Sequence, residues 1–263
     1  MLAGRPGGQS RGSTGMTRSE VLAQYRPIRD GIQRVLRLAA DTCKRADLTR
    51  AVKQVAPWAA EELSDEEAAD MFVDVALFEP NQRGRQAFER FLADKGEQLD
   101  TVDQALAQRM TRAYFSIFRV AERHEAAGLW LEDLLDDNRR LWLVDEGLEA
   151  SAPEGAVLGM RLFDAGPFHA GFGIIVAPDE ETIAFCVEAK ARGGPLPVRH
   201  SLAATLYGDR LRAHAPPGPA DLALLQTVLE LFSTAPTMPE ALTPPKVSRR
   251  SPHPRRRSHP PKR

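Results

Sequence analysis

Apolar side chains recur at helical spacing in the first part of the chain. The stripe that follows Pro27 would turn one face of a helix towards a core. It consists of Ile32, Val35, Leu36, Ala39, Ala40 and Cys43. Ser64 and Glu67 have the spacing of a capping box, which predicts the start of a second helix that ends near Pro80. Two shorter helices are expected before residue 112.

From Tyr114 the pattern changes to short runs rich in aromatic and β-branched residues, separated by turn residues. Such runs are typical of strands. The five runs are AYFSIFRVA, LWLEDLL, RLWLV, AVLGMRLF and FHAGFGIIV. Because no helical pattern separates them, they predict a strongly curved antiparallel sheet or a small barrel rather than a parallel α/β sheet. Gly159, Gly171 and Gly173 lie inside these runs and would permit the bends.

Helical patterns return after the strands, with helices expected over 178–192, Leu202–Leu211 and Leu222–Phe232. The predicted fold class is therefore α+β, with N-terminal helices, a central five-stranded antiparallel curved sheet or small barrel, and C-terminal helices. The predicted segments are a disordered leader over 1–18, a helical segment over 19–112, a β module over 113–177, C-terminal helices over 178–235 and a Pro/Arg-rich disordered tail over 236–263. Met16 is an alternative start of translation.

The charge is distributed unevenly, although the net charge of the 263 residues is only -1. Residues 246–263 contain eight basic residues and no acid, and residues 1–18 add three more. The remaining body therefore holds 24 basic and 36 acidic residues, a net charge of -12. Tail side chains that could neutralise phosphates are Arg249, Arg250, Arg255, Arg256 and Arg257. The tail predicts weak nucleic-acid contact. The alternatives are a solvated, disordered extension and an extension that folds back on the acidic body.

The two cysteines, Cys43 and Cys186, lie far apart and match no C-x-x-C spacing. This spacing argues against a disulfide framework and a four-ligand zinc site, and it favours a reducing compartment. The N-terminal residues lack the apolar segment of a signal peptide, and nowhere do 18 apolar residues run together. We expect a cytoplasmic protein without a membrane span. The Ala-, Arg- and Leu-rich composition suggests a bacterial source.

Two catalytic motifs with a fixed spacing, G-x-x-x-x-G-K-[ST] and H-E-x-x-H, do not occur. The letters G-x-S-x-G occur only at Gly8–Gly12, in the Gly-rich leader and not between a predicted strand and helix. We therefore predict no catalytic residue, no metal and no cofactor. The acidic group Glu132, Asp133, Asp136 and Asp137 could hold a hard cation, but a hairpin turn is the favoured interpretation. His169 shares a strand face with two glycines, which could leave room for a ligand.

The hairpin that carries Trp130 and Trp142 is the main candidate surface for binding. If its turn centres on Asp137, Trp130 pairs with Val144 and the two indoles are diagonal neighbours on one face. The opposite face carries Leu129, Leu131, Leu141 and Leu143. A hairpin that is apolar on both faces is covered once by the interior of the sheet and once by a helix, a partner or a base-stacking ligand.

Three segments resemble the non-zinc portion of a family of uncharacterised, mostly bacterial proteins that carry a SEC-C metal-binding motif. They are FVDVALFEPNQRGRQAFERFL, LDTVDQALAQRM and YFSIFRVAERHEAAGLWLEDLLDDN. The Cys-rich SEC-C motif itself is absent, so the resemblance implies no metal ligand. It implies a helical segment that leads into a small β-barrel-like module with no established reaction.

The sequence predicts a non-enzymatic binding or protein-interaction module. Its candidate binding residues are Trp130, Trp142, His169 and the tail arginines. One alternative is a nucleic-acid-associated protein that uses the basic tail. Another is an enzyme that uses separated groups such as Asp133 with His169. A protein partner is expected under the first prediction, and the oligomeric state is left open.

Overall fold

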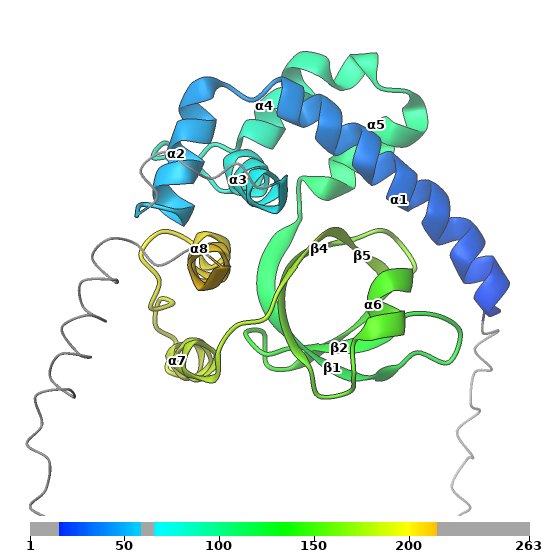
Figure 1. The fold of residues 1–263 in the computed structure, drawn as a ribbon. Helices are drawn as coiled ribbons and strands as arrows, with labels where there is room; N and C mark the ends of the chain where they lie inside the picture. Colours follow the sequence, from blue (N-terminus) through cyan, green and yellow to red (C-terminus); the bar gives the residue numbers. More distant parts are fainter. Residues whose placement is uncertain (1–15, 59–65, 215–263) are drawn as a thin grey trace, which may run out of the picture. The chain divides into compact units, whose positions relative to one another are not determined.

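A computed structural model describes residues 16–58 and 66–214, which belong to one compact unit of the chain. Helices precede and follow a five-stranded barrel, as Figure 1 shows, so the predicted α+β class is confirmed. The N-terminal helices are α1 (Arg18–Asp41), α2 (Arg45–Val55), α3 (Glu66–Phe78), α4 (Ala87–Lys95), the 3-10 turn η1 (Gly96–Gln98) and α5 (Thr101–Met110). The helices that follow the barrel are α7 (Glu180–Ala191) and α8 (Leu202–His214). The expected helix over 222–232 lies outside the described residues.

Helix α1 begins nine residues before Pro27, whereas the sequence pattern predicted a start after that proline. A capping box explains the earlier start, because Thr17 Oγ1 accepts from the Glu20 N–H and Glu20 accepts from the Thr17 N–H. Pro27 lies on the exposed face of α1, where water can satisfy the carbonyl that a proline leaves without its helical donor. The described helices are all too short or too polar to cross a bilayer.

The barrel consists of β1 (Tyr114–Arg123), β2 (Leu129–Asp133), β3 (Arg139–Leu143), β4 (Val157–Asp164) and β5 (His169–Val176). These strands match the five apolar runs of the sequence, and they close in the order β1-β2-β3-β5-β4. The expectation of a purely antiparallel sheet was wrong, because β3 and β5 pair in parallel at Leu143 and His169. A closed ring with an odd number of strands requires at least one parallel neighbour, so closure itself imposes this pair.

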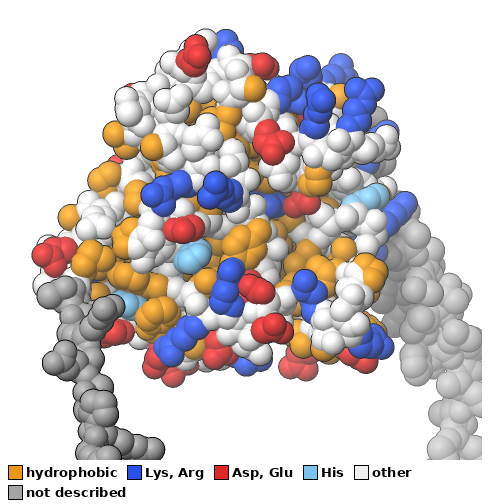
Figure 2. Space-filling model, turned by 180° about the vertical axis from the view of Figure 1, so that it is seen from behind, with side chains coloured by type: hydrophobic (Ala, Val, Ile, Leu, Met, Phe, Trp, Pro, Cys, Tyr) orange, Lys and Arg blue, Asp and Glu red, His pale blue; other side chains and the backbone are white. Residues whose placement is uncertain are grey.

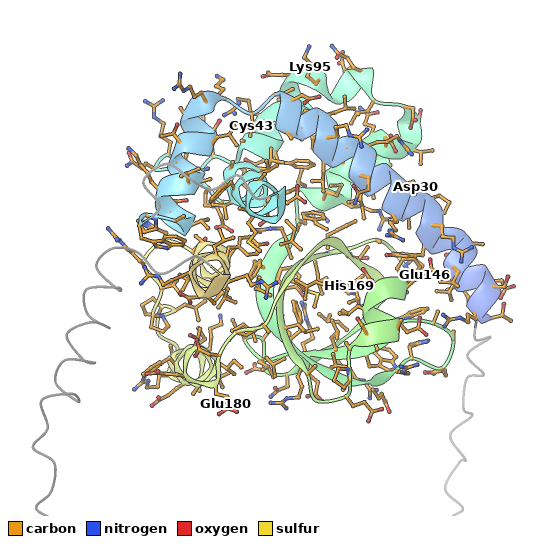
Figure 3. All side chains as sticks on the ribbon, viewed as in Figure 1. Asp30, Cys43, Lys95, Glu146, His169 and Glu180 are labelled. Carbon is orange, nitrogen blue, oxygen red and sulfur yellow. The ribbon has the colours of Figure 1, made fainter. Side chains whose placement is uncertain are left out.

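Alternating side chains fill the inside of the barrel, as the period of a strand requires. The buried cluster there contains Phe118, Val120, Leu129, Leu131, Leu141, Leu143, Met160 and Leu162, together with Leu148 and Ala152. Leu148 belongs to α6 (Glu146–Ser151), a short helix that the sequence pattern did not predict. Helix α6 lies across one opening of the barrel and is tied to α1 by an ion pair of 2.9 Å between Glu146 and Arg26 (Figures 1 and 3).

The outer face of the barrel is joined to the helices by a buried polar group. Arg161 on β4 forms ion pairs with Asp74 on α3 and with Glu79 just after it. Tyr207 on α8 donates its hydroxyl to Asp74 at 3.2 Å. Burial alone would lower the pKa of Arg161, but the two carboxylates outweigh burial and hold that pKa above its usual range. The group therefore fixes the barrel, α3 and α8 to one another.

Candidate functional site at the open end of the barrel

Polar side chains gather at the end of the barrel that lies opposite α6. Strands β1, β3 and β5 begin at this end, while β2 and β4 finish there. Tyr114, Asp133, Arg139, Asp164 and His169 occupy these strand ends. Figure 3 shows His169 within the outline of the barrel, and Figure 2 views the molecule from the side of this end, where charged, histidine and apolar side chains mix. The barrel thus has one end covered by α6 and one polar end.

Two adjoining hollows open at the polar end, with volumes of about 590 and 380 Å³. Tyr114 and Arg139 line both hollows. The larger one, here called the barrel-end pocket, is lined by Gln108, Arg109, Thr111, Arg112, Tyr114, Arg139, Asp164 and His169. The smaller one includes Ser116 and Asp133. Helix α5 and its C-terminal connection therefore complete a pocket that the strand ends begin.

Three guanidinium groups face one carboxylate in the barrel-end pocket. Arg139 is held in place because its Nη2 donates to the Tyr114 hydroxyl at 2.9 Å and its Nε lies 3.0 Å from Asp136 Oδ2. Arg109 Nη1 lies 3.9 Å from Asp164 Oδ1. Arg112 makes no ion pair with any residue that the structure describes. Two of the three guanidinium groups therefore have a carboxylate partner, and the charge of Arg112 has none among the described residues, although the body of the chain is acidic.

The uncharged groups of the pocket remain neutral near pH 7. Burial lowers the pKa of His169 and, together with the nearby Arg139, outweighs the opposing effect of Asp164. Burial also raises the pKa of the Tyr114 hydroxyl, which therefore keeps its proton. Both side chains can exchange hydrogen bonds with a ligand without adding charge.

Asp133 is buried beneath the smaller hollow, and burial raises the pKa of its carboxyl group. Its Oδ1 accepts hydrogen bonds from Ser116 Oγ at 2.5 Å and from the Leu135 N–H at 3.1 Å. These bonds fix the turn after β2. The other acids of the predicted cluster are dispersed, because Glu132 pairs with Arg119 and Asp136 pairs with Arg139. Over 16–58 and 66–214, no three His, Cys, Asp or Glu side chains form a group suited to a metal ion.

A family model matches residues 19–187, which is more than half of the chain and extends from α1 into α7. The chain belongs to a family of unknown function, DUF7986. The whole barrel and every residue of the barrel-end pocket lie inside the DUF7986 segment. No curated protein and no solved structure matches the chain. The resemblance to the SEC-C proteins stays a prediction.

The two tryptophans of the DUF7986 barrel are direct cross-strand partners, so the expected diagonal register was wrong. Trp130 pairs with Trp142, and Leu129 pairs with Leu143. The turn takes in Leu134 and Leu135, which the sequence pattern placed in the strand. It closes through Asp137 and Asn138, whose φ angles of 49° and 55° are left-handed. The turn is therefore centred on Asp136 rather than Asp137, and the partner of Trp130 is Trp142 instead of Val144.

The chain's own side chains cover much of both indoles. Trp142 donates its Nε1 hydrogen to the Ala127 carbonyl at 2.8 Å. The ring of His124 stacks on Trp142, with the centroids 3.9 Å apart and the planes at 8°. Trp130 lies beneath the guanidinium of Arg140, at 4.7 Å from the ring centroid. A role for Trp130 and Trp142 in partner binding stays a prediction.

Sequence reasoning found only part of the candidate site. It singled out His169, which does line the barrel-end pocket. It missed Arg109, Arg112, Tyr114 and Arg139, which come from α5, its connection and two strands, so that no local spacing relates them. The tail residues Arg249, Arg250, Arg255, Arg256 and Arg257 lie outside the described residues.

Proposed function

We propose that the protein is a non-enzymatic binding protein whose barrel-end pocket takes a small anionic ligand. The observation that carries this proposal is the guanidinium of Arg112, which lines the pocket of about 590 Å³ beside Arg109 and Arg139 and pairs with no carboxylate of the described residues. Planar guanidinium groups bind carboxylates and phosphates through paired hydrogen bonds. A cation-lined pocket on an acidic body would attract an anion that the rest of the surface repels.

The pocket also limits the kind of anion. Its volume lies in the range of sites for small molecules, so a ligand larger than a single inorganic ion would fit. Tyr114 and neutral His169 would serve the polar, uncharged part of such a ligand, while Arg112 and Arg139 would hold its carboxylate or phosphate. The proposed class is therefore a polar metabolite that carries a carboxylate or phosphate group.

Isothermal titration with inorganic phosphate, a short dicarboxylate and a sugar phosphate tests this proposal. Arg112→Gln should weaken binding of a carboxylate or phosphate by about tenfold, because one charge-assisted contact is lost. Arg119→Gln is the matched control, since Arg119 lies on another part of the barrel and pairs with Glu132. Equal losses in both variants, or no binding of any of the three anions by the native chain, would remove the proposal.

An enzyme that uses Asp133 with His169 is the alternative at this same end. Both groups lie at the polar end of the barrel, in hollows that share Tyr114 and Arg139. A carboxyl group with a raised pKa can act as a general acid. We favour binding because Asp133 already accepts two hydrogen bonds from its own turn. Mass spectrometry of a bound ligand after incubation distinguishes the two, since a binding protein returns the ligand intact.

A second role is proposed for the tail, as a nucleic-acid arm. Its eight basic residues and lack of acids support weak binding through phosphate contacts. Fluorescence anisotropy of single-stranded RNA and duplex DNA across a salt series tests it. The triple variant Arg255→Gln, Arg256→Gln and Arg257→Gln should weaken binding and flatten its salt dependence. Binding that is equal in the native chain and the variant would contradict this role.

We infer a cytoplasmic location in a bacterium. The two thiols support the location, because Cys43 and Cys186 are both free, as expected in a reducing compartment. The Ala-, Arg- and Leu-rich composition supports the source. Labelling of the thiols in intact cells and in lysate would test whether they stay reduced there.

A further inference from the structure

A second basic hollow, of about 760 Å³, lies away from the barrel end. It follows one side of α2 and reaches the connection after α3 and the residues before α8. Its lining residues are Arg45, Ala46, Thr49, Arg50, Lys53, Gln54, Pro80, Gln82 and His200. We call it the α2 groove. Figure 2 shows Lys and Arg side chains gathered at the upper right, over the region of α2.

The lining of the α2 groove contains three permanent cations and no carboxylate. Arg45, Arg50 and Lys53 make no ion pair with any described residue. Arginines elsewhere commonly do, as Arg34 does with Asp103 and Arg90 with Asp47. Among the described residues, no carboxylate compensates the positive charge of this groove.

Arg50 forms a fixed part of the floor of the groove. Its Nη2 donates to the carbonyls of Ala76 and Glu79 at the end of α3, at 3.2 and 3.1 Å. Its Nη1 donates to Gln54 at 3.1 Å. The guanidinium is therefore held in one position by backbone and amide oxygens, while its charge has no carboxylate partner. A ligand anion would meet a cation whose side chain is already ordered, which lowers the entropic cost of binding.

The start of α2 adds an independent observation. Its N-cap residue is Lys44, which makes no side-chain cap, and its first residue is Arg45. The N-terminal end of a helix carries partial positive charge and favours acidic or capping side chains. Asp47, the acid of the first turn, is buried and paired with Arg90, so on the exposed side two cations oppose the local preference. Such conflicts are expected at functional sites. An anion bound beside Arg45 would relieve the conflict.

We propose that the α2 groove binds an acidic segment of a partner protein. Arg45 and Lys53 are eight residues apart on one helix, a distance of about 12 Å, which an extended peptide of about four residues spans. Two or three carboxylates of such a segment would face Arg45, Arg50 and Lys53. A long nucleic acid fits less well, because beyond the groove its phosphates would meet the acidic body, whose net charge is -12.

Fluorescence anisotropy of a labelled hexapeptide of alternating Asp and Glu, titrated with the full chain, tests this inference. We expect binding that weakens as salt is added, and no binding of the same peptide with Asn and Gln in place of the acids. The double variant Arg45→Gln and Lys53→Gln should lose about tenfold in affinity. Arg29→Gln with Lys95→Gln is the matched control, because it removes the same charge from exposed positions outside the groove.

Each other outcome overturns the inference. Equal losses of peptide affinity in the groove variant and the control variant would show that the peptide responds to the overall charge of the protein rather than to a site in the groove. Loss of binding in the triple tail variant, Arg255→Gln with Arg256→Gln and Arg257→Gln, and not in the groove variant would place the site in the tail. A single-stranded oligonucleotide of equal charge that binds more tightly, and loses that binding in the groove variant, would make the groove a nucleic-acid surface. The groove does not involve the barrel-end pocket, so the two proposals stand or fall separately.

Discussion

Arg161 and Asp74 form a two-bonded ion pair in the interior, with Nε 2.9 Å from Oδ1 and Nη2 3.1 Å from Oδ2. Their side chains are only 4% and 2% exposed. Truncation of Asp74 would leave the buried Arg161 with Glu79 as its only carboxylate partner and the Tyr207 hydroxyl without its acceptor, so Asp74→Ala should lower the free energy of unfolding by about 3 kcal/mol. Urea denaturation followed by circular dichroism measures this change.

The matched control for that prediction is the exposed pair of Arg119 and Glu132. Glu132→Ala should cost less than about 1 kcal/mol, because solvent screens the pair. The double variant Asp74→Leu with Arg161→Met should be more stable than Asp74→Ala, since no buried charge remains from the pair. If Asp74→Ala costs no more than Glu132→Ala, the buried pair does not fix the barrel to α3.

Gly128 is required at its position by both backbone angle and space. Its φ is +84°, and a Cβ there would lie 2.1 Å from the Leu143 carbonyl oxygen. Gly155 has a similar φ of +81° but open space around it. Gly128→Ala should therefore cost about 3 kcal/mol of stability and Gly155→Ala about 1 kcal/mol. Thermal and urea unfolding of both variants measure the difference, and equal costs would show that the close approach to Leu143 relaxes freely.

The two tryptophans should differ in their contribution to stability. Trp142 packs against the apolar cluster formed by the helices and the outer face of the barrel, and its Nε1 donates a hydrogen bond to the Ala127 carbonyl. Trp142→Ala should cost about 3 kcal/mol and Trp130→Ala about 1 kcal/mol. If neither substitution changes stability or recovery of a protein partner, the hairpin is neither a structural element nor a binding surface.

Stability should fall as the pH is lowered from 7 to 5. Burial lowers the pKa of both His124 and His169, so the unfolded chain takes up these protons before the folded chain does. Their contribution is complete above about pH 6.5, the usual histidine pKa, and is lost as the pH falls through the lower folded values. The double variant His124→Asn with His169→Asn should show a smaller loss between these pH values in urea denaturation. An unchanged loss would assign the pH dependence to the carboxylates.

The strands were predictable because alternate side chains of each strand are buried inside the barrel, which gives the sequence an alternating pattern. The spacing of Leu129, Leu131, Leu141 and Leu143 predicted that they share one face, and the structure shows that this face points into the barrel. Helix α2 was missed although Leu48, Ala51, Val52 and Val55 recur at helical spacing, because no capping residue marks its start: its N-cap is Lys44. It packs on α3 and α8. The register of the tryptophan hairpin depends on the left-handed backbone of Asp137 and Asn138. The sequence Asp-Asp-Asn is compatible with several turn types, so it does not determine this backbone.

The candidate site was less predictable than the fold. Closure of the barrel brings the ends of β1, β3 and β5 together with α5, and only this long-range step places Arg112 beside Arg139 and His169. Periodicity reports which face of an element is buried, but it carries no information about which elements meet at their ends. His169 was found because small residues share its strand face, a local signal that the arginines lack.

The parallel contact between β3 and β5 also bears on self-association. An unpaired strand edge is a template for pairing with another chain, and closure of the ring removes both edges at once. The seam is narrow, because it is registered only at Leu143 and His169, with a further bond of 3.1 Å from the Val144 N–H to the His169 carbonyl. Opening of this seam would free two edges together. The protein's resistance to strand-mediated aggregation therefore depends on a few atoms beside the same histidine that lines its pocket.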